Sequence, residues 1–225
     1  MPLEPDITNP PADVLAEQAK LAAAVTQVVP TKQLDQNLLI ATWNLRAFGG
    51  LTKDWQSRKG DSPKRNFRDV RFVAEIVSHF DVIAIQEVRG DLRALRHLMK
   101  VLGPEWGFLL TDVTKGPAGN NERLAFLYDT RRVKPSGLAC ELVVWVETES
   151  PEITTGALNR QFVRTPYACS FVTTGAPPGT TFILVTLHVD WGSRAADRVP
   201  ELTEIANWLG RQDCDESRPP GRTGS

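Results

Sequence analysis

The chain is poor in cysteine, the residue that cross-links small secreted domains through disulfides and binds many structural metals. Its three cysteines are odd in number, widely separated and free of C-x-x-C spacing, so neither a disulfide framework nor a cysteine metal site is indicated: Cys140, Cys169 and Cys214. Free thiols are typical of a reducing compartment. We therefore expect a cytoplasmic protein.

The sequence also lacks long apolar runs and a charge excess. No run approaches the roughly 20 apolar residues that a membrane-spanning helix needs, and residues 1–6 do not form a signal peptide. The net charge of −1 and the pI of about 6.3 give no overall attraction for nucleic acid, although a local basic surface is compatible with them. We expect no membrane contact, and no pattern indicates an obligate protein partner.

What is present suffices for a full hydrophobic core, because 41% of the 225 residues are hydrophobic. Residues 1–36 are interpreted as a leader with a helix at 12–28, and residues 37–210 as the main domain. Residues 211–225 contain no aliphatic side chain, which predicts a disordered or frame-shifted tail.

Two apolar runs, at 38–44 and 81–89, end abruptly in polar residues, Asn44 and Glu87. Each run is typical of a strand that is buried on both faces. If the strands are neighbours in one sheet, the two polar side chains lie at the same edge. An amide beside a carboxylate suits a hard divalent cation and a phosphate oxygen.

A helix is expected between these strands, with Ser62 as its N-cap, Pro63 at its first position and apolar residues at helical spacing from Phe67 to Phe80. The remaining patterns predict a helix capped by Asp91 and a helix at 194–209, with strands at 106–111, 123–128, 138–146, 167–173 and 181–187.

Residues 53–71 contain seven basic and three acidic side chains. Such a run is usually a solvated helix face. The alternative interpretation is a surface that contacts a phosphate backbone.

Three histidines narrow the choice of a proton-transfer residue. His79 and His97 lie at the end of one predicted helix and inside the next, where structural or surface roles are expected. His188 instead ends an apolar strand, as Asn44 and Glu87 do, and a carboxylate would fix its tautomer.

Five short motifs, in this order, resemble the endonuclease/exonuclease/phosphatase superfamily with its DNase I-like fold: Ala41-Thr42-Trp43-Asn44, Ile85-Gln86-Glu87-Val88-Arg89, Asn121-Glu122-Arg123, Arg164-Thr165-Pro166-Tyr167 and Thr186-Leu187-His188. The resemblance covers about residues 38–210. It implies an α/β four-layer sandwich, in which two central mixed sheets are flanked by helices.

The resemblance also implies roles for single residues. Glu87 would bind Mg²⁺ or Mn²⁺, and Asn44 would help to position the metal's water shell and the phosphate. Glu122 would orient His188, and His188 would act as the acid toward the leaving oxygen. Arg89 and Arg164 resemble the arginines that reach the phosphate groups of the substrate. The basic run at residues 53–71 favours nucleic acid as that substrate.

The later motifs of the superfamily, Gly-Asp-Phe-Asn and a late Asp-His pair, are absent from this sequence. In the superfamily these residues normally activate the attacking water. The C-terminal part of the fold is therefore expected to be missing, with apolar strand edges exposed. Three interpretations stay open: a metal-dependent phosphodiester hydrolase, in particular a nuclease, that is truncated and weakly active or inactive; a non-catalytic remnant or binding module; and a phosphatase acting on a small phosphoester or lipid phosphate.

Overall fold

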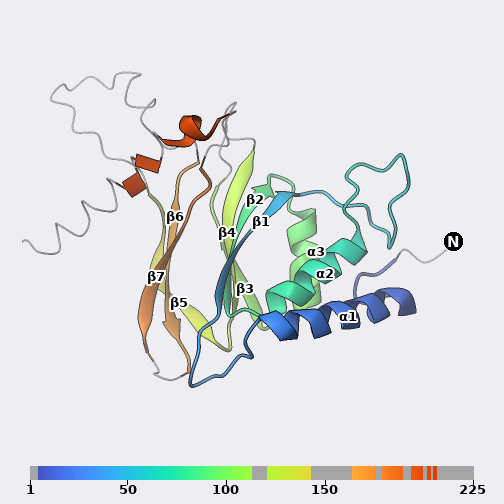
Figure 1. Ribbon diagram of the computed structural model, residues 1–225, viewed down its shortest axis with the longest axis horizontal. Helices are drawn as coiled ribbons and strands as arrows, with labels where there is room; N and C mark the ends of the chain where they lie inside the picture. Colours follow the sequence, from blue (N-terminus) through green and yellow to red (C-terminus); the bar gives the residue numbers. More distant parts are fainter. Residues whose placement is uncertain are drawn as a thin grey trace, which may run out of the picture.

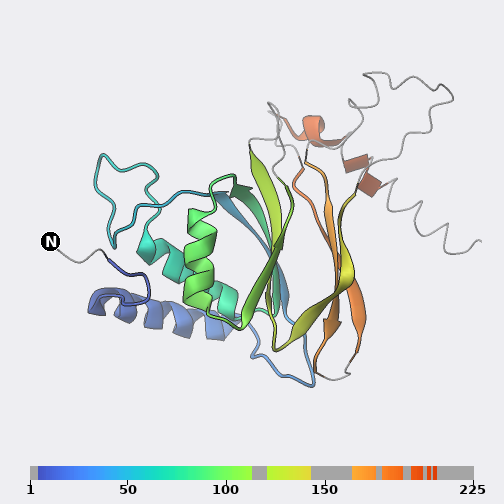
Figure 2. The same ribbon diagram turned by 180° about the vertical axis from the view of Figure 1, so that it is seen from behind.

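Two β-sheets face each other, and three helices cover the outer side of one of them (Figures 1 and 2). This computed structural model describes residues 5–112, 121–142, 164–175, 179–189 and 194–199, together with 202, 203, 205 and 206. The elements are α1 (Ala12–Val28), β1 (Ile40–Phe48), α2 (Phe67–Ser78), β2 (Val82–Arg89), α3 (Arg93–Leu102), β3 (Trp106–Leu110), β4 (Glu122–Asp129), β5 (Val133–Glu141), β6 (Tyr167–Thr173), β7 (Thr181–Thr186) and the short 3₁₀ helix η2 (Ala195–Arg198).

The first sheet has the order β1-β2-β4-β3 and is mixed, because β1 and β2 are parallel and the other pairs are antiparallel. The second sheet has the order β5-β6-β7 and its described pairs are antiparallel. The predicted mixed α/β fold with two sheets and flanking helices is confirmed. Within the described ranges the three α-helices all lie on the first sheet's side (Figure 1).

Strand β2 contributes side chains to both hydrophobic layers. Ile83 and Ile85 lie in the cluster between the helices and the first sheet, whereas Val82 and Ala84 lie in the cluster between the two sheets. This explains why the sequence shows a continuous apolar run there rather than an alternating one.

The start of α2 corrects one prediction. Asn66, rather than Ser62, is the N-cap: its side chain accepts hydrogen bonds from the N–H groups of Arg68 (2.9 Å) and Asp69 (3.3 Å), and the Asp69 carboxylate accepts one from the N–H of Asn66 (2.9 Å). This reciprocal capping box satisfies donors that the first turn would otherwise leave unpaired. Ser62 and Pro63 belong to the preceding loop.

Other boundaries differ by a few residues. The first strand runs on to Phe48, and β5 begins at Val133, five residues earlier than expected. Strand β5 tolerates Pro135 because it lies at the edge of the sheet that the described strands form. The helix predicted at 194–209 is represented by η2 and by a few helical residues up to 206, and the predicted tail at 211–225 lies outside the described residues.

Helix α1 packs against α2 through polar side chains. Arg68 pairs with Asp13 and with Glu17 (2.7 Å), and Arg71 Nε donates to Gln18 Oε1 (2.9 Å). Two basic residues of the run at 53–71 thus bind the leader helix. No helix that the structure describes has both the length and the apolar character needed to cross a membrane.

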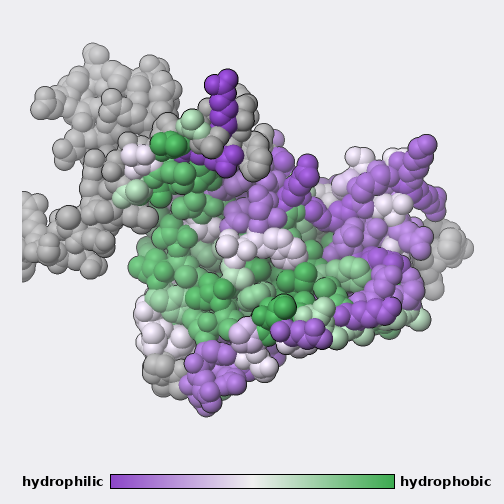
Figure 3. Space-filling model, in the orientation of Figure 1, coloured by the Kyte–Doolittle hydropathy of each residue, from purple (hydrophilic) through white to green (hydrophobic). Residues whose placement is uncertain are grey.

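Strands β1 and β7 form open edges of the two sheets, as far as the described strands extend. Large apolar side chains are exposed on them: Ile40 by 45%, Ile183 by 58% and Val185 by 41%. A groove of about 450 Å³ runs between the edges and is floored by Ala84 and Phe126. Figure 3 shows a broad hydrophobic area on this face.

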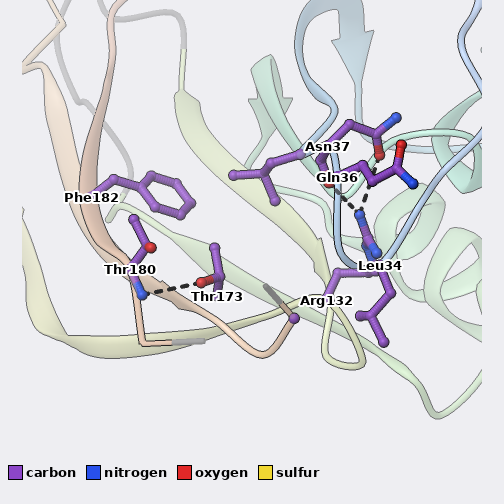
Figure 4. A pocket seen from close by; sticks show the side chains of 9 residues that line it. Leu34, Gln36, Asn37, Arg132, Thr173, Thr180 and Phe182 are labelled. Atoms are coloured by element: carbon purple, nitrogen blue, oxygen red, sulfur yellow. Dashed lines mark hydrogen bonds between the residues drawn. The ribbon is translucent and has the colours of Figure 1, made fainter. Parts of the chain in front are cut away.

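A second pocket, of about 270 Å³, lies at the end of the second sheet where β6 ends and β7 begins (Figure 4). Arg132 forms part of its wall and donates to the backbone oxygen of Asn37 (2.5 Å) and to the fully buried carboxylate of Asp81 (2.9 Å). The Asp81 carboxylate also accepts the N–H of Leu39 (2.7 Å). These contacts hold the segment before β1 against the residues that directly precede β2 and β5.

Candidate active site

Four polar side chains from both sheets meet at the end of the fold opposite the pocket of Figure 4. Asn44 belongs to β1, Glu87 to β2 and Glu122 to the start of β4, while His188 follows β7 by two residues. Because β1 and β2 are parallel, their carboxyl ends share one edge, as the sequence predicted.

A β-bulge places Glu87 in this group. The register of β2 is interrupted between Ile85 and Val88, and Glu87 has a left-handed backbone with φ 62°. Val88 returns to the helix-side core that holds Ile85, so Glu87 is the extra residue. Gln86 and Glu87, although consecutive, therefore both face the polar end of the sheets.

The facing part of β1 is irregular as well. Arg46 and Ala47 have positive φ (36° and 52°), and their N–H groups turn toward the site. The N–H of Arg46 donates to Asn44 Oδ1 (2.9 Å), and that of Ala47 donates to Glu87 Oε2 (2.9 Å). Asn44 Nδ2 donates to Glu87 Oε1 (2.8 Å), so both carboxylate oxygens are held in place.

These bonds act on the charge of Glu87. Partial burial alone would raise the pKa of this carboxyl, but the hydrogen bonds from Asn44 and from the N–H of Ala47 outweigh it, so the pKa is lowered. Glu87 is therefore an anion at neutral pH.

Glu122 is almost completely buried and is surrounded by cationic groups. Arg164 Nε donates to its Oε2 (2.6 Å), and Arg89 Nη2 lies 3.3 Å from its Oε1. Within the described residues Arg164 Nη1 has no hydrogen-bond partner. The two predicted phosphate-binding arginines thus contact Glu122 in this structure, and their contact with a substrate stays a prediction.

The ring of His188 lies between two carboxylates. Its Nδ1 is 3.3 Å from Glu122 Oε2, close enough for an ion pair but poorly aligned for a hydrogen bond, and its Nε2 is 3.8 Å from Glu87 Oε1. Burial lowers the pKa of the imidazole, the charge of Arg164 lowers it further, and the carboxylates do not reverse the shift. At neutral pH the neutral ring is favoured.

The other two histidines lie elsewhere. His79 ends α2 and contacts Glu75 (3.4 Å), and the ring of His97 packs 5.1 Å from the ring of Phe67, measured between centroids. Both positions agree with the structural roles expected from the sequence.

Two residues near the site were not singled out from the sequence. A cavity of about 310 Å³ beside Asn44 and His188 is also lined by Gln86 and Arg198. Gln86 could have been noticed as an amide at the end of an otherwise apolar buried run. Arg198 gave no local signal, because only the chain's path after β7 brings η2 to this cavity.

The oxygen atoms of Glu87 and Asn44 suit a hard divalent cation, which prefers carboxylate, amide and water ligands. The described part of the chain contains no group of three or more histidine, cysteine, aspartate or glutamate residues placed to hold a metal. Mg²⁺ commonly uses only one or two protein carboxylates and keeps several waters. The residues present therefore fit such an ion, with the anionic Glu87 as its protein anchor.

No family model matches the chain. A curated relative, a deoxyribonuclease of Thioalkalivibrio sp. (strain K90mix), is 27% identical over 201 residues, which cover 87% of this chain and 47% of the relative. The chain thus spans about half the length of the curated relative that it matches. That relative is consistent with the DNase I-like superfamily that the motifs resemble.

Three solved structures are each similar to about three quarters of this chain. A functionally unknown conserved protein of Enterococcus faecalis V583 has a TM-score of 0.48 at 20% identity, covering 77% of this chain and 61% of that one. An endonuclease/exonuclease/phosphatase family protein of Bacteroides thetaiotaomicron has a TM-score of 0.45 at 20% identity, covering 77% of this chain and 59% of that one. A mannosyl-6-phosphatase of the same species has a TM-score of 0.46 at 19% identity, covering 78% of this chain and 61% of that one.

Proposed function

We propose that this chain, which resembles the endonuclease/exonuclease/phosphatase superfamily, carries part or all of a divalent-metal-dependent phosphodiester hydrolase of nuclease type. The observation that supports this proposal best is the meeting of Asn44, Glu87, Glu122 and His188 at one end of the two sheets. An anionic oxygen ligand, an amide and an imidazole are the groups that phosphodiester hydrolysis needs for charge neutralisation and proton transfer.

Glu87 and Asn44 would hold Mg²⁺ or Mn²⁺, which would neutralise charge on the scissile phosphate. Asn44, fixed by the N–H of Arg46, would orient the phosphate. Glu122 would favour the tautomer of His188 that carries its proton on Nδ1. The anionic phosphate would raise the pKa of His188 on binding, so that Nε2 could give a proton to the leaving oxygen. A water molecule would attack phosphorus as the bond to that oxygen breaks, and the proton of the water would pass to solvent.

Nucleic acid is the proposed substrate class, because the curated relative is named a deoxyribonuclease. A polyanionic substrate makes several phosphate contacts, so its binding should weaken steeply as salt concentration rises. Binding of a small phosphoester should weaken much less. This comparison separates the nuclease from the phosphatase interpretation.

The test is Mg²⁺-dependent turnover of plasmid DNA and of an aryl phosphodiester. Wild type should exceed the Glu87→Ala variant by about 100-fold or more, because Glu87 anchors the metal. Glu75→Gln is the matched control: this carboxylate lies on α2 near His79, away from the site, and its replacement should leave turnover unchanged.

Equal rates for wild type and Glu87→Ala would reject the hydrolase proposal for this chain. The non-catalytic interpretation would then be favoured if the protein still binds DNA or Mg²⁺. Unchanged Mg²⁺ binding in the Glu87→Ala variant would remove Glu87 from the metal site.

A further inference from the structure

Gln86 joins the two sheets directly beneath the candidate active site. Its Nε2 donates to Thr42 Oγ1 of β1 (2.9 Å) and to Thr186 Oγ1 of β7 (2.9 Å). The two N–H bonds of one amide nitrogen thus reach hydroxyl groups on both sheets. Gln86 and Thr186 are buried, so water does not compete effectively for the bond between them, whereas Thr42 is exposed and its bond to Gln86 is only partly buried.

The two threonines are linked in sequence to the site residues. Thr42 precedes Asn44 by two positions on β1, so their side chains share one face of that strand. Thr186 is the last residue of β7 and precedes His188 by two positions. Gln86 itself precedes Glu87 across the bulge.

We propose that Gln86 is the positioning residue that sets His188, carried by the second sheet, against Asn44 and Glu87, carried by the first. No other described side chain hydrogen-bonds to both of these threonine hydroxyls. The catalytic role of Gln86 rests on the proposed function. The pair of hydrogen bonds from Gln86 to Thr42 and Thr186, called the tie below, does not depend on that function.

Removal of the tie allows the end of β7 to shift relative to β1 and β2. Displacing a catalytic group by about 1 Å can reduce turnover by about 100-fold without abolishing substrate binding. The effect should therefore appear in kcat rather than in KM.

The variants isolate each half of the tie. Gln86→Met keeps the length of the side chain but removes the donor. Thr42→Val removes one acceptor while Thr42→Ser keeps it. Gln18→Met, on α1, is the control glutamine, and should match wild type.

In Mg²⁺-dependent hydrolysis of an aryl phosphodiester, Gln86→Met and Thr42→Val should each lower kcat by about 10- to 100-fold with KM within about twofold. Thr42→Ser should recover most of the loss. The double variant should lose no more than Gln86→Met alone, because both remove one interaction. A lower melting temperature with unchanged kcat well below it would overturn the proposal, since a purely structural role predicts that result.

A second measurement does not need turnover. The ring signals of His188 in NMR spectra at one fixed pH should move in Gln86→Met and Thr42→Val, and stay in place in Thr42→Ser. Thr42 and His188 line the same cavity, so the comparison of Thr42→Val with Thr42→Ser, which keeps the hydroxyl, separates the hydrogen bond from a direct effect of shape. If wild type shows no turnover but these shifts occur, the proposed function fails and the tie stands. Unmoved His188 signals in both variants would refute the tie.

Discussion

The Nε atom of Arg164 donates to Oε2 of Glu122 at 2.6 Å, and both side chains are buried. This pair joins the segment before β6 to the start of β4. It therefore bridges the two sheets beside His188, and the hydrogen bonds of Gln86 form a second link between them.

Replacement of Arg164 by methionine should destabilise the fold, because it leaves the Glu122 carboxylate buried with less compensation. We expect a loss of about 3 kcal/mol in the free energy of unfolding, at the lower end for a broken buried pair because Arg89 stays near Oε1. Urea unfolding measures it. Arg93→Met, which removes a solvent-exposed pair with Asp91, should change stability little. Equal effects would contradict the burial argument.

The predicted cap and the observed cap of α2 make a paired test. Asn66→Ala should cost about 1 kcal/mol of stability, because two N–H groups of the first turn lose their acceptor. Ser62→Ala should cost almost nothing, since the helix begins only at Phe67. Thermal and urea unfolding would show the difference, and a reversed order would mean that the helix starts earlier.

Stability should depend on pH through Asp129. Burial alone would raise the pKa of this carboxyl, but hydrogen bonds from Arg131 outweigh it with help from the charge of Lys32, so the pKa lies below its ordinary value of 3.8. A lowered pKa contributes stability that is present above the ordinary value and lost as pH falls through the folded-state value.

The Asp129→Asn variant should accordingly be less stable than wild type by about 1 kcal/mol at neutral pH, an amount kept small because Arg131 is largely solvated. The gap should close as the pH falls below 3.8. Urea unfolding at several pH values measures the gap. A gap that widens in acid would show that the sign is wrong.

The open edges at β1 and β7 predict self-association that grows with protein concentration, because exposed apolar edge strands pair with other chains. Ile183→Lys should shift sedimentation toward the monomer, since a charge at an exposed edge opposes pairing. Val28→Lys is the matched control, because Val28 is 80% exposed but belongs to helix α1 rather than to an edge strand. The same shift in both variants would indicate a general charge effect.

Much of this arrangement could be predicted from the sequence. Apolar runs that stop at Asn44 and Glu87 predicted two strands with polar ends, and α1 has the predicted bounds. The predicted burial on both faces is confirmed for β2 but is wrong for β1, which lies at the edge of the described sheet and is largely exposed. The start of α2 could not be predicted, because Ser62-Pro63 resembles a helix start as strongly as Asn66 does. Only packing decides between such local signals.

Long-range partners account for the other differences. Arg68 appeared in the sequence as part of a basic run, yet its partners lie on α1, 51 and 55 residues away. Gln86 bonds to a threonine 100 residues later. No local sequence pattern indicates such long-range pairings. The tie between the sheets therefore could not be predicted from the sequence.

The left-handed backbone at Glu87 has a consequence for engineering. This conformation costs a non-glycine residue about 1 kcal/mol, whereas glycine adopts it readily. A redesign that ranks substitutions by folding stability alone would thus be drawn to glycine at position 87. Such an optimised chain would keep its sheets and its helices while losing the carboxylate around which the proposed chemistry is built.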